Sequence, residues 1–214
     1  LKEAGSGAVK LMLYYEVDGP GEINRKKQDL VERVGSESAA AGLPLVLELM
    51  AYDAASDNNK SQEYAKVKPH KVNGMIKEFA KDRYAVDVLK VEVPVNMAYV
   101  AGYSETNETV YTKAAAAAYF KEQTELTNHV PFIFLSAGVS AELFQQTLKF
   151  AAAAGSTFNG VLCGRATWKG AIEPFAKEGT AAGKRWLNQQ GRKNIEELNA
   201  VLKVSANSLF DKVD

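Results

Sequence analysis

Residues 86–93 read VDVLKVEV, and Pro94 ends this run. Five of its eight residues are Val or Leu, and branched apolar residues in a short, nearly continuous run are typical of a parallel strand that is buried on both faces. Lys90 stands at the centre of the run. A lysine ammonium is rarely buried unless it is paired or reacting. The stretch therefore predicts both a parallel sheet and a lysine with a task inside that sheet.

Similar apolar runs recur along the chain, and helical patterns lie between them. The other strand-like runs are 8–15, 43–50, 131–138 and 160–166, and the helical patterns are 24–42, 69–85, 112–129 and 140–156, followed by a helical tail with apolar positions at Ile195, Leu198 and Leu202. We expect Pro69 in the first turn of its helix, Thr112 and Ser140 as N-caps, and a polar connection over 51–71. Alternating strands and helices predict βαβ units and a parallel sheet covered by helices.

Two α/β architectures fit this order, an open doubly wound sheet and a (β/α)8 barrel. The first strand is followed by no G-x-G-x-x-G motif, and the chain has no Walker A motif. Five βα units are too few for a whole barrel but suit its second half. Residues 1–7 lack an initial Met and read like the end of a helix, so we expect the chain to be a piece of a longer protein.

Composition narrows the classes of partner. The 214 residues hold 26 basic and 26 acidic side chains, and no basic run is of the kind that grips nucleic acid. No run of about 18 apolar residues predicts a membrane span. Cys163 is the single cysteine, which fits a reducing cytoplasm, and His70 and His129 stand apart from other metal-ligating residues. We expect no nucleic acid or membrane partner, no metal and no other cofactor.

Charged residues lie inside three consecutive apolar strands. Lys10, Glu48 and Lys90 each stand within a run of apolar neighbours. Side chains alternate between the two faces of a strand, and neighbouring strands are about 4.8 Å apart. If all three residues face the same side of the sheet, Glu48 lies between the two lysines.

Such a group could carry aldol chemistry. Apolar surroundings and a nearby second cation both favour the neutral amine of a lysine, which can attack a ketone and form an imine. A neighbouring carboxylate can move the protons that carbinolamine dehydration and C–C cleavage require. The same charges could instead form a purely structural network, although burying ions costs several kcal/mol each before pairing.

The ends of the last two predicted strands resemble a phosphate site. Ser136 and Gly138 close one strand, and Gly164 and Arg165 close the next. In (β/α)8 barrels the loops after the last two strands commonly bind phosphate through backbone N–H groups. The guanidinium of an arginine can donate two parallel hydrogen bonds to a phosphate, although an arginine at this place can equally form a surface ion pair.

Five segments resemble the tagatose 1,6-bisphosphate aldolases, which are class I aldolases close to the sulfofructose-phosphate aldolases. These segments are LMLYYEVD, LVLELMAYD, VLKVEVPV, LSAGVS and GVLCGRATWKGAI. The resemblance spans the whole chain. It implies Lys90 as the imine-forming lysine, Glu48 as the acid/base and Lys10 as a further active-site lysine. It also implies a phosphate site at Arg165, with Ser136 and Gly138 beside it.

The resemblance further implies that residues 1–214 form a single domain, the C-terminal part of a (β/α)8 barrel that holds strands four to eight, with the first three βα units missing. The implied reaction is cleavage of a ketose 1,6-bisphosphate into dihydroxyacetone phosphate and glyceraldehyde 3-phosphate. Two alternatives stay open: a sulfofructose-phosphate aldolase, and a catalytically silent sugar-phosphate-binding protein with a regulatory task. The Ala-rich helices and the helical tail could also dock against another subunit in a homo-oligomer.

Overall fold

The sheet has five parallel strands that follow one another in chain order. A computed structural model describes residues 1–56, 58–104, 108–127 and 129–211. The strands are β1 (Val9–Tyr15), β2 (Leu45–Ala51), β3 (Val88–Val91), β4 (Phe132–Leu135) and β5 (Val161–Leu162), in the spatial order β1-β2-β3-β4-β5. A doubly wound sheet reverses its strand order at a switch point. This sheet shows no reversal among its strands, so the order is that of a (β/α)8 barrel rather than of a doubly wound sheet.

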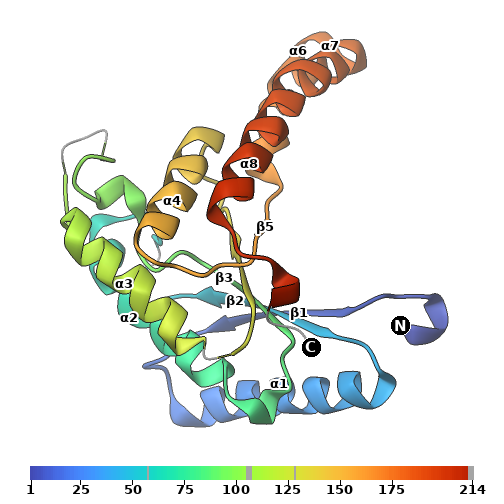
Figure 1. Cartoon of the computed structure of the whole chain (residues 1–214), viewed down its shortest axis with the longest axis vertical. Helices are drawn as coiled ribbons and strands as arrows, with labels where there is room; N and C mark the ends of the chain where they lie inside the picture. The colour runs from blue at the N-terminus through green and yellow to red at the C-terminus, as the bar shows by residue number, and fades with distance from the viewer. Residues whose placement is uncertain (57, 105–107, 128, 212–214) are drawn as a thin grey trace.

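Four long helices connect consecutive strands. They are α1 (Gly21–Ala41), α2 (Gln62–Phe79), α3 (Lys113–Leu126) and α4 (Ala141–Ala153). These helices lie along the outer side of the curved sheet (Figure 1). The core between them and the sheet is fully buried at Leu47, Leu49, Phe132 and Phe134. On β1 the opposite face is open, because Met12 and Tyr14 are about half exposed.

Short elements and a helical tail complete the chain. The tail consists of α5 (Arg165–Trp168), η4 (Lys169–Ala171), α6 (Ile172–Glu178), α7 (Thr180–Trp186), the π-helical η5 (Leu187–Gly191) and α8 (Arg192–Ser205), and the remaining turns are η1 (Lys2–Ala4), η2 (Asp82–Tyr84), η3 (Met97–Tyr99) and η6 (Leu209–Asp211). Helices α6 and α7 project from the body, whereas α8 packs back on α4 (Figure 1). In the part of the chain described, no helix has the length and apolar character needed to cross a membrane.

Local capping chemistry fixes two of the long helices where the sequence predicts them. The Thr112 hydroxyl accepts a hydrogen bond from the Ala115 backbone N–H at 3.1 Å, and α3 begins at the next residue. The Ser140 hydroxyl accepts in the same way from Leu143 at 3.2 Å, ahead of α4. Both N-cap predictions are confirmed. Residue 128, inside the predicted helix 112–129, lies outside the described residues.

The predicted helix start at Pro69 is wrong. Helix α2 begins at Gln62, because the Ser61 hydroxyl caps it by accepting from the Tyr64 N–H at 3.1 Å. Pro69 lies inside the helix, where a proline removes one backbone hydrogen bond and costs roughly 3 kcal/mol. Complete burial of apolar side chains on the same helix, such as Val72, offsets that cost. Half of the predicted polar connection 51–71 is therefore helix.

Helix α8 packs two of its three predicted apolar positions on the core, since Leu198 is buried and Leu202 is partly buried against it, but not the first, Ile195. Its buried residues are Asn194, Leu198, Val201 and Ser205. Ile195, predicted as part of the apolar stripe, is 42% exposed. Asn194 takes the inner position because its side-chain amide donates to the Thr167 carbonyl at 2.9 Å, so a hydrogen bond to the preceding segment sets the rotation of the helix.

Candidate active site

The three strand charges meet as predicted, with Glu48 between two lysines. The register pairs Glu48 with Lys90 directly, and Lys90 Nζ lies 2.8 Å from Glu48 Oε1. Lys10 forms an ion pair with Glu48 Oε2 from a diagonal position, since Met12 is the residue of β1 directly opposite Glu48. Glu48 and Lys90 are buried, whereas the Lys10 side chain is 47% exposed. The carboxylate thus bridges a buried amine and a solvent-facing one.

The two lysines keep Glu48 ionised. Burial alone would raise the pKa of the Glu48 carboxyl. Hydrogen bonds from Lys10 and Lys90, together with their positive charge, outweigh burial and hold the pKa of Glu48 below its ordinary value. At neutral pH the group beside Lys90 is therefore a carboxylate that is able to accept a proton.

The segment after β4 has an unusual backbone and an arginine beside it. Ala137 and Gly138 both have left-handed φ values, 49° and 75°. The Arg165 guanidinium carbon is 3.9 Å from where a Cβ of Gly138 would stand. Arg165 is exposed and forms no ion pair with another described residue. Ser136 is buried and hydrogen-bonds Cys163, whose thiol pKa burial raises more than this bond lowers it. The structure thus brings Ser136, Gly138 and Arg165 into one place.

Gly164 has a different structural setting. Its φ is −129°, outside the left-handed region, and a Cβ there would lie 3.4 Å from Trp168 Nε1. Its predicted contact with a phosphate stays a prediction.

Sequence reasoning missed a second set of buried charges at the carboxyl ends of the strands. On α2, Lys71 pairs with Glu16, with Asp18 at 2.8 Å and with Asp53 at 3.5 Å. One helical turn earlier, Lys68 lies 3.5 Å from Glu92. The signal was present, because positions 68, 71 and 72 share one face of a helix that starts after Ser61, but a helix that starts at Pro69 hides that spacing.

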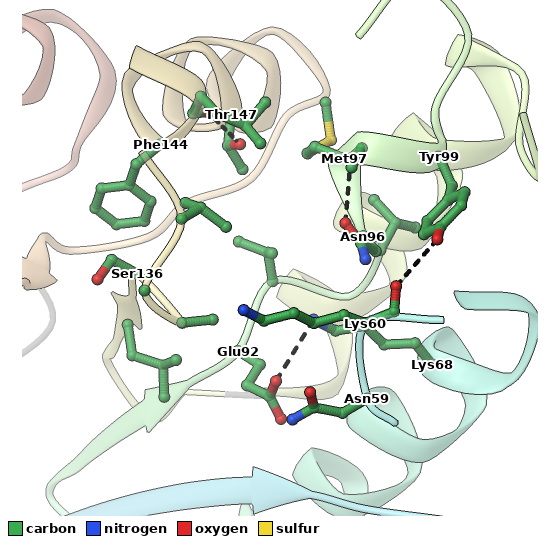
Figure 2. Close-up of a pocket in the computed structure, with 18 residues that line it drawn as sticks. Asn59, Lys60, Lys68, Glu92, Asn96, Met97, Tyr99, Ser136, Phe144 and Thr147 are labelled. Atoms are coloured by element: carbon green, nitrogen blue, oxygen red, sulfur yellow. Dashed lines mark hydrogen bonds and ion pairs between the residues drawn. The ribbon is translucent and has the colours of Figure 1, made fainter. Parts of the chain in front are cut away.

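A pocket of about 250 Å³ lies at the carboxyl ends of β3 and β4. Figure 2 shows the Lys68–Glu92 pair and the side chain of Lys60 within it. The 136–139 segment forms part of its wall, and Met97 and Phe144 are among its apolar residues.

Among the described residues, no three His, Cys, Asp or Glu side chains lie together as a metal site would need.

Two solved structures with a similar fold are named as fructose-bisphosphate aldolases. The structure of "an Archaeal fructose-1,6-bisphosphate aldolase with the catalytic Lys covalently bound to the carbinolamine intermediate of the substrate" aligns with a TM-score of 0.55 at 17% identity, over 92% of this chain and 60% of that one. A fructose-bisphosphate aldolase from Plasmodium falciparum aligns with a TM-score of 0.60 at 18% identity, over 97% and 60%. At this identity the likeness establishes the fold, part of a (β/α)8 barrel.

Two relatives in sequence are named tagatose 1,6-diphosphate aldolase. A tagatose 1,6-diphosphate aldolase 2 of Enterococcus faecalis is 59% identical over 213 residues, and a tagatose 1,6-diphosphate aldolase of Staphylococcus epidermidis is 56% identical over 212. The alignments take in 100% and 99% of this chain and 64% and 65% of those proteins, so the chain spans just under two thirds of their length. The family described as DeoC/LacD family aldolase matches residues 1–170. The chain belongs to the DeoC/LacD family of aldolases.

Proposed function

We propose that this protein is a class I aldolase that cleaves a ketose 1,6-bisphosphate, such as tagatose 1,6-bisphosphate, into dihydroxyacetone phosphate and glyceraldehyde 3-phosphate. The observation that carries the proposal is the buried Lys90 amine 2.8 Å from the Glu48 carboxylate. The names of the relatives support the same substrate class.

Imine formation is the first half of the proposed reaction. The unprotonated Lys90 amine attacks the C2 carbonyl, and a proton passes from nitrogen to oxygen to give a carbinolamine. Glu48 takes up a proton from solvent and donates it to the C2 hydroxyl, which leaves as water. The resulting iminium is an electron sink at C2.

Cleavage is the second half. Glu48, again a carboxylate, accepts the proton of the C4 hydroxyl, and the C3–C4 bond breaks. Its electron pair moves toward the iminium and forms an enamine, while C4 departs as the aldehyde of glyceraldehyde 3-phosphate. Protonation of the enamine at C3 and hydrolysis of the imine release dihydroxyacetone phosphate and restore Lys90. Lys10 holds Glu48 from its other oxygen during these proton transfers.

The segment 136–138 and Arg165 form the phosphate site of the proposal. We place one substrate phosphate at the backbone of Ser136 and Gly138, with the Arg165 guanidinium beside it. The 13-residue helix α4 begins just after this segment, and its N-terminal dipole favours an anion there. Gly164 belongs to this proposal only as the residue that precedes Arg165.

We also propose that these five strands are strands four to eight of a single barrel domain. Exposed Met12 and Tyr14 on β1 support this arrangement, because a closed barrel would cover them. Assembly into a homo-oligomer and a cytoplasmic location belong to the same proposal, the location supported by the single cysteine.

Borohydride trapping tests the proposal. The full chain is incubated with dihydroxyacetone phosphate, reduced, and its adduct located by peptide mass spectrometry. We expect one adduct on Lys90, none in Lys90→Met, and an unchanged adduct in the control Lys26→Met, whose side chain is exposed and paired with Glu22. An adduct on another lysine, or none in the wild-type chain, would contradict the imine mechanism. Condensation with glyceraldehyde 3-phosphate or with sulfolactaldehyde then separates the two aldolase alternatives.

A further inference from the structure

The pocket at the ends of β3 and β4 carries one unbalanced charge. Lys68 and Glu92 line it and neutralise each other at 3.5 Å. Lys60 is the other charged side chain in its lining, and its ammonium forms no ion pair with any residue that the structure describes. Since Lys60 extends into the pocket (Figure 2), the pocket has a net positive charge.

The backbone of Lys60 is held in place by a hydrogen bond, whereas its side-chain ammonium forms no ion pair with the described residues. Its carbonyl accepts a hydrogen bond from the Tyr99 hydroxyl at 3.0 Å, which ties the segment before α2 to η3. The side chain itself is exposed. An anchored residue with an unpaired ammonium is suited to meeting an anion from solution, because the pairing does not require the chain to move.

Gly138 connects this pocket with the arginine. It lines the pocket that holds Lys60, and the Arg165 guanidinium lies 3.9 Å from the position of a Cβ on the same residue. Arg165 itself lines a neighbouring depression with Val139 and Ala141. Gly138 therefore shares a pocket with Lys60, which precedes α2, and lies close to Arg165, which follows β5.

We propose that Lys60 is a phosphate-binding, specificity-determining residue that, together with Arg165, contacts the phosphate of the dihydroxyacetone half at the 136–138 segment. This inference rests on the proposed function and adds a residue to its substrate site.

Charge balance supports two cations at this position. A phosphate monoester carries a charge between about −1.5 and −2 at neutral pH. Arg165 alone would leave part of that charge unmatched, and the Lys68 ammonium is already paired with Glu92. Apolar wall residues such as Met97 and Phe144 lower the local dielectric, which strengthens an ion pair formed against them.

Phosphate binding by the full chain gives the first test. Titration calorimetry measures the Kd of inorganic phosphate for the wild type, for Lys60→Met and for the control Lys66→Met, an exposed lysine of α2 outside this pocket. We expect a Kd about tenfold higher in K60M, the usual scale for a lost charged hydrogen bond, and no change in K66M. Equal Kd values for wild type and K60M would overturn the inference.

Imine trapping gives the second test and separates the two proposals. With dihydroxyacetone phosphate, the concentration for half-maximal trapping should rise about tenfold in K60M, and with unphosphorylated dihydroxyacetone it should stay unchanged. Equal shifts for both ketones would refute a phosphate contact. If phosphate binding depends on Lys60 but the wild type traps no imine, the proposed function fails and the phosphate site stands. If imine forms but neither the Kd nor the trapping depends on Lys60, the proposed function stands and the inference about Lys60 fails.

Discussion

Replacing Lys71 with methionine tests whether the buried charges at the strand ends hold the fold together. The Lys71 side chain is 8% exposed and that of its partner Glu16 is 5% exposed. Removing one member of a buried ion pair leaves an uncompensated charge and typically costs about 3–5 kcal/mol. Glu16 would keep a hydrogen bond from the Ala54 N–H at 2.9 Å, which favours the lower end of that range. We therefore expect a loss of about 3 kcal/mol.

The pKa of Lys71 shows that this charge persists in the folded state. Burial acts to lower the pKa, but hydrogen bonds from Lys71 to Asp18 and Glu16 and the charge of both carboxylates outweigh it, so the pKa lies above its ordinary value. A raised lysine pKa contributes stability that is fully present below the unfolded pKa and is lost only as the pH rises through the folded one. The effect of the substitution should accordingly be constant between pH 6 and pH 8.

Urea denaturation followed by circular dichroism measures the effect as a free energy of unfolding. For a chain of this size, 3 kcal/mol corresponds to a fall in Tm of about 6–12 °C. Lys26→Met serves as the control, because Lys26 and Glu22 are each 73% exposed and such pairs contribute under about 1 kcal/mol. Adding Glu16→Gln to Lys71→Met should recover part of the loss. A loss in K71M no larger than in K26M, or no recovery in the double variant, would refute the reasoning.

Three further predictions concern Glu48 and the cap of α4. Glu48→Gln should lower kcat by about 10²–10⁴-fold and should also slow the formation of the adduct that borohydride traps on Lys90, since the amide cannot transfer the protons of either half of the reaction; an unchanged kcat in steady-state assays would argue against this role. The lowered pKa of Glu48 also contributes stability that is present above the unfolded pKa of about 4.3 and is lost as the pH falls through the folded value, so E48Q should have a flatter dependence of unfolding free energy on pH in acid. Ser140→Ala should cost about 1 kcal/mol in urea denaturation because the Leu143 N–H loses its acceptor, and Ser140→Asn should restore most of it; equal losses in both variants would rule out a capping effect.

The elements that the sequence predicts well are those decided by neighbouring residues. Thr112 and Ser140 cap their helices with their own hydroxyls, so each helix start is visible in a window of four residues. Helix α2 shows the opposite case. A rule about proline at helix starts competes there with the Ser61 cap, and the deciding energy comes from burial of a whole helix face. That burial is a tertiary property.

The same distinction applies to the site. Alternation along parallel strands is enough to bring Glu48 beside Lys90, because register and a period of two fix both positions. It is not enough for the approach of Arg165 to Gly138, which depends on the left-handed turn after β4. Lys60 is an unremarkable residue of a polar segment until the pocket around it is known.

The two buried networks differ in how many partners share each charge, and this difference suits one to the proposed reaction and the other to a structural task. Lys71 is one cation among several carboxylates, so losing its proton would leave Glu16 buried without compensation. Glu48 is one carboxylate between two lysines. In the proposed reaction Lys90 gives up its proton to solvent and becomes a nucleophile. Glu48 is then still paired with Lys10, so no buried charge is left alone. The solvent-facing lysine thus lets the buried one change its charge state at small electrostatic cost, which a structural ion pair of the same two residue types could not do.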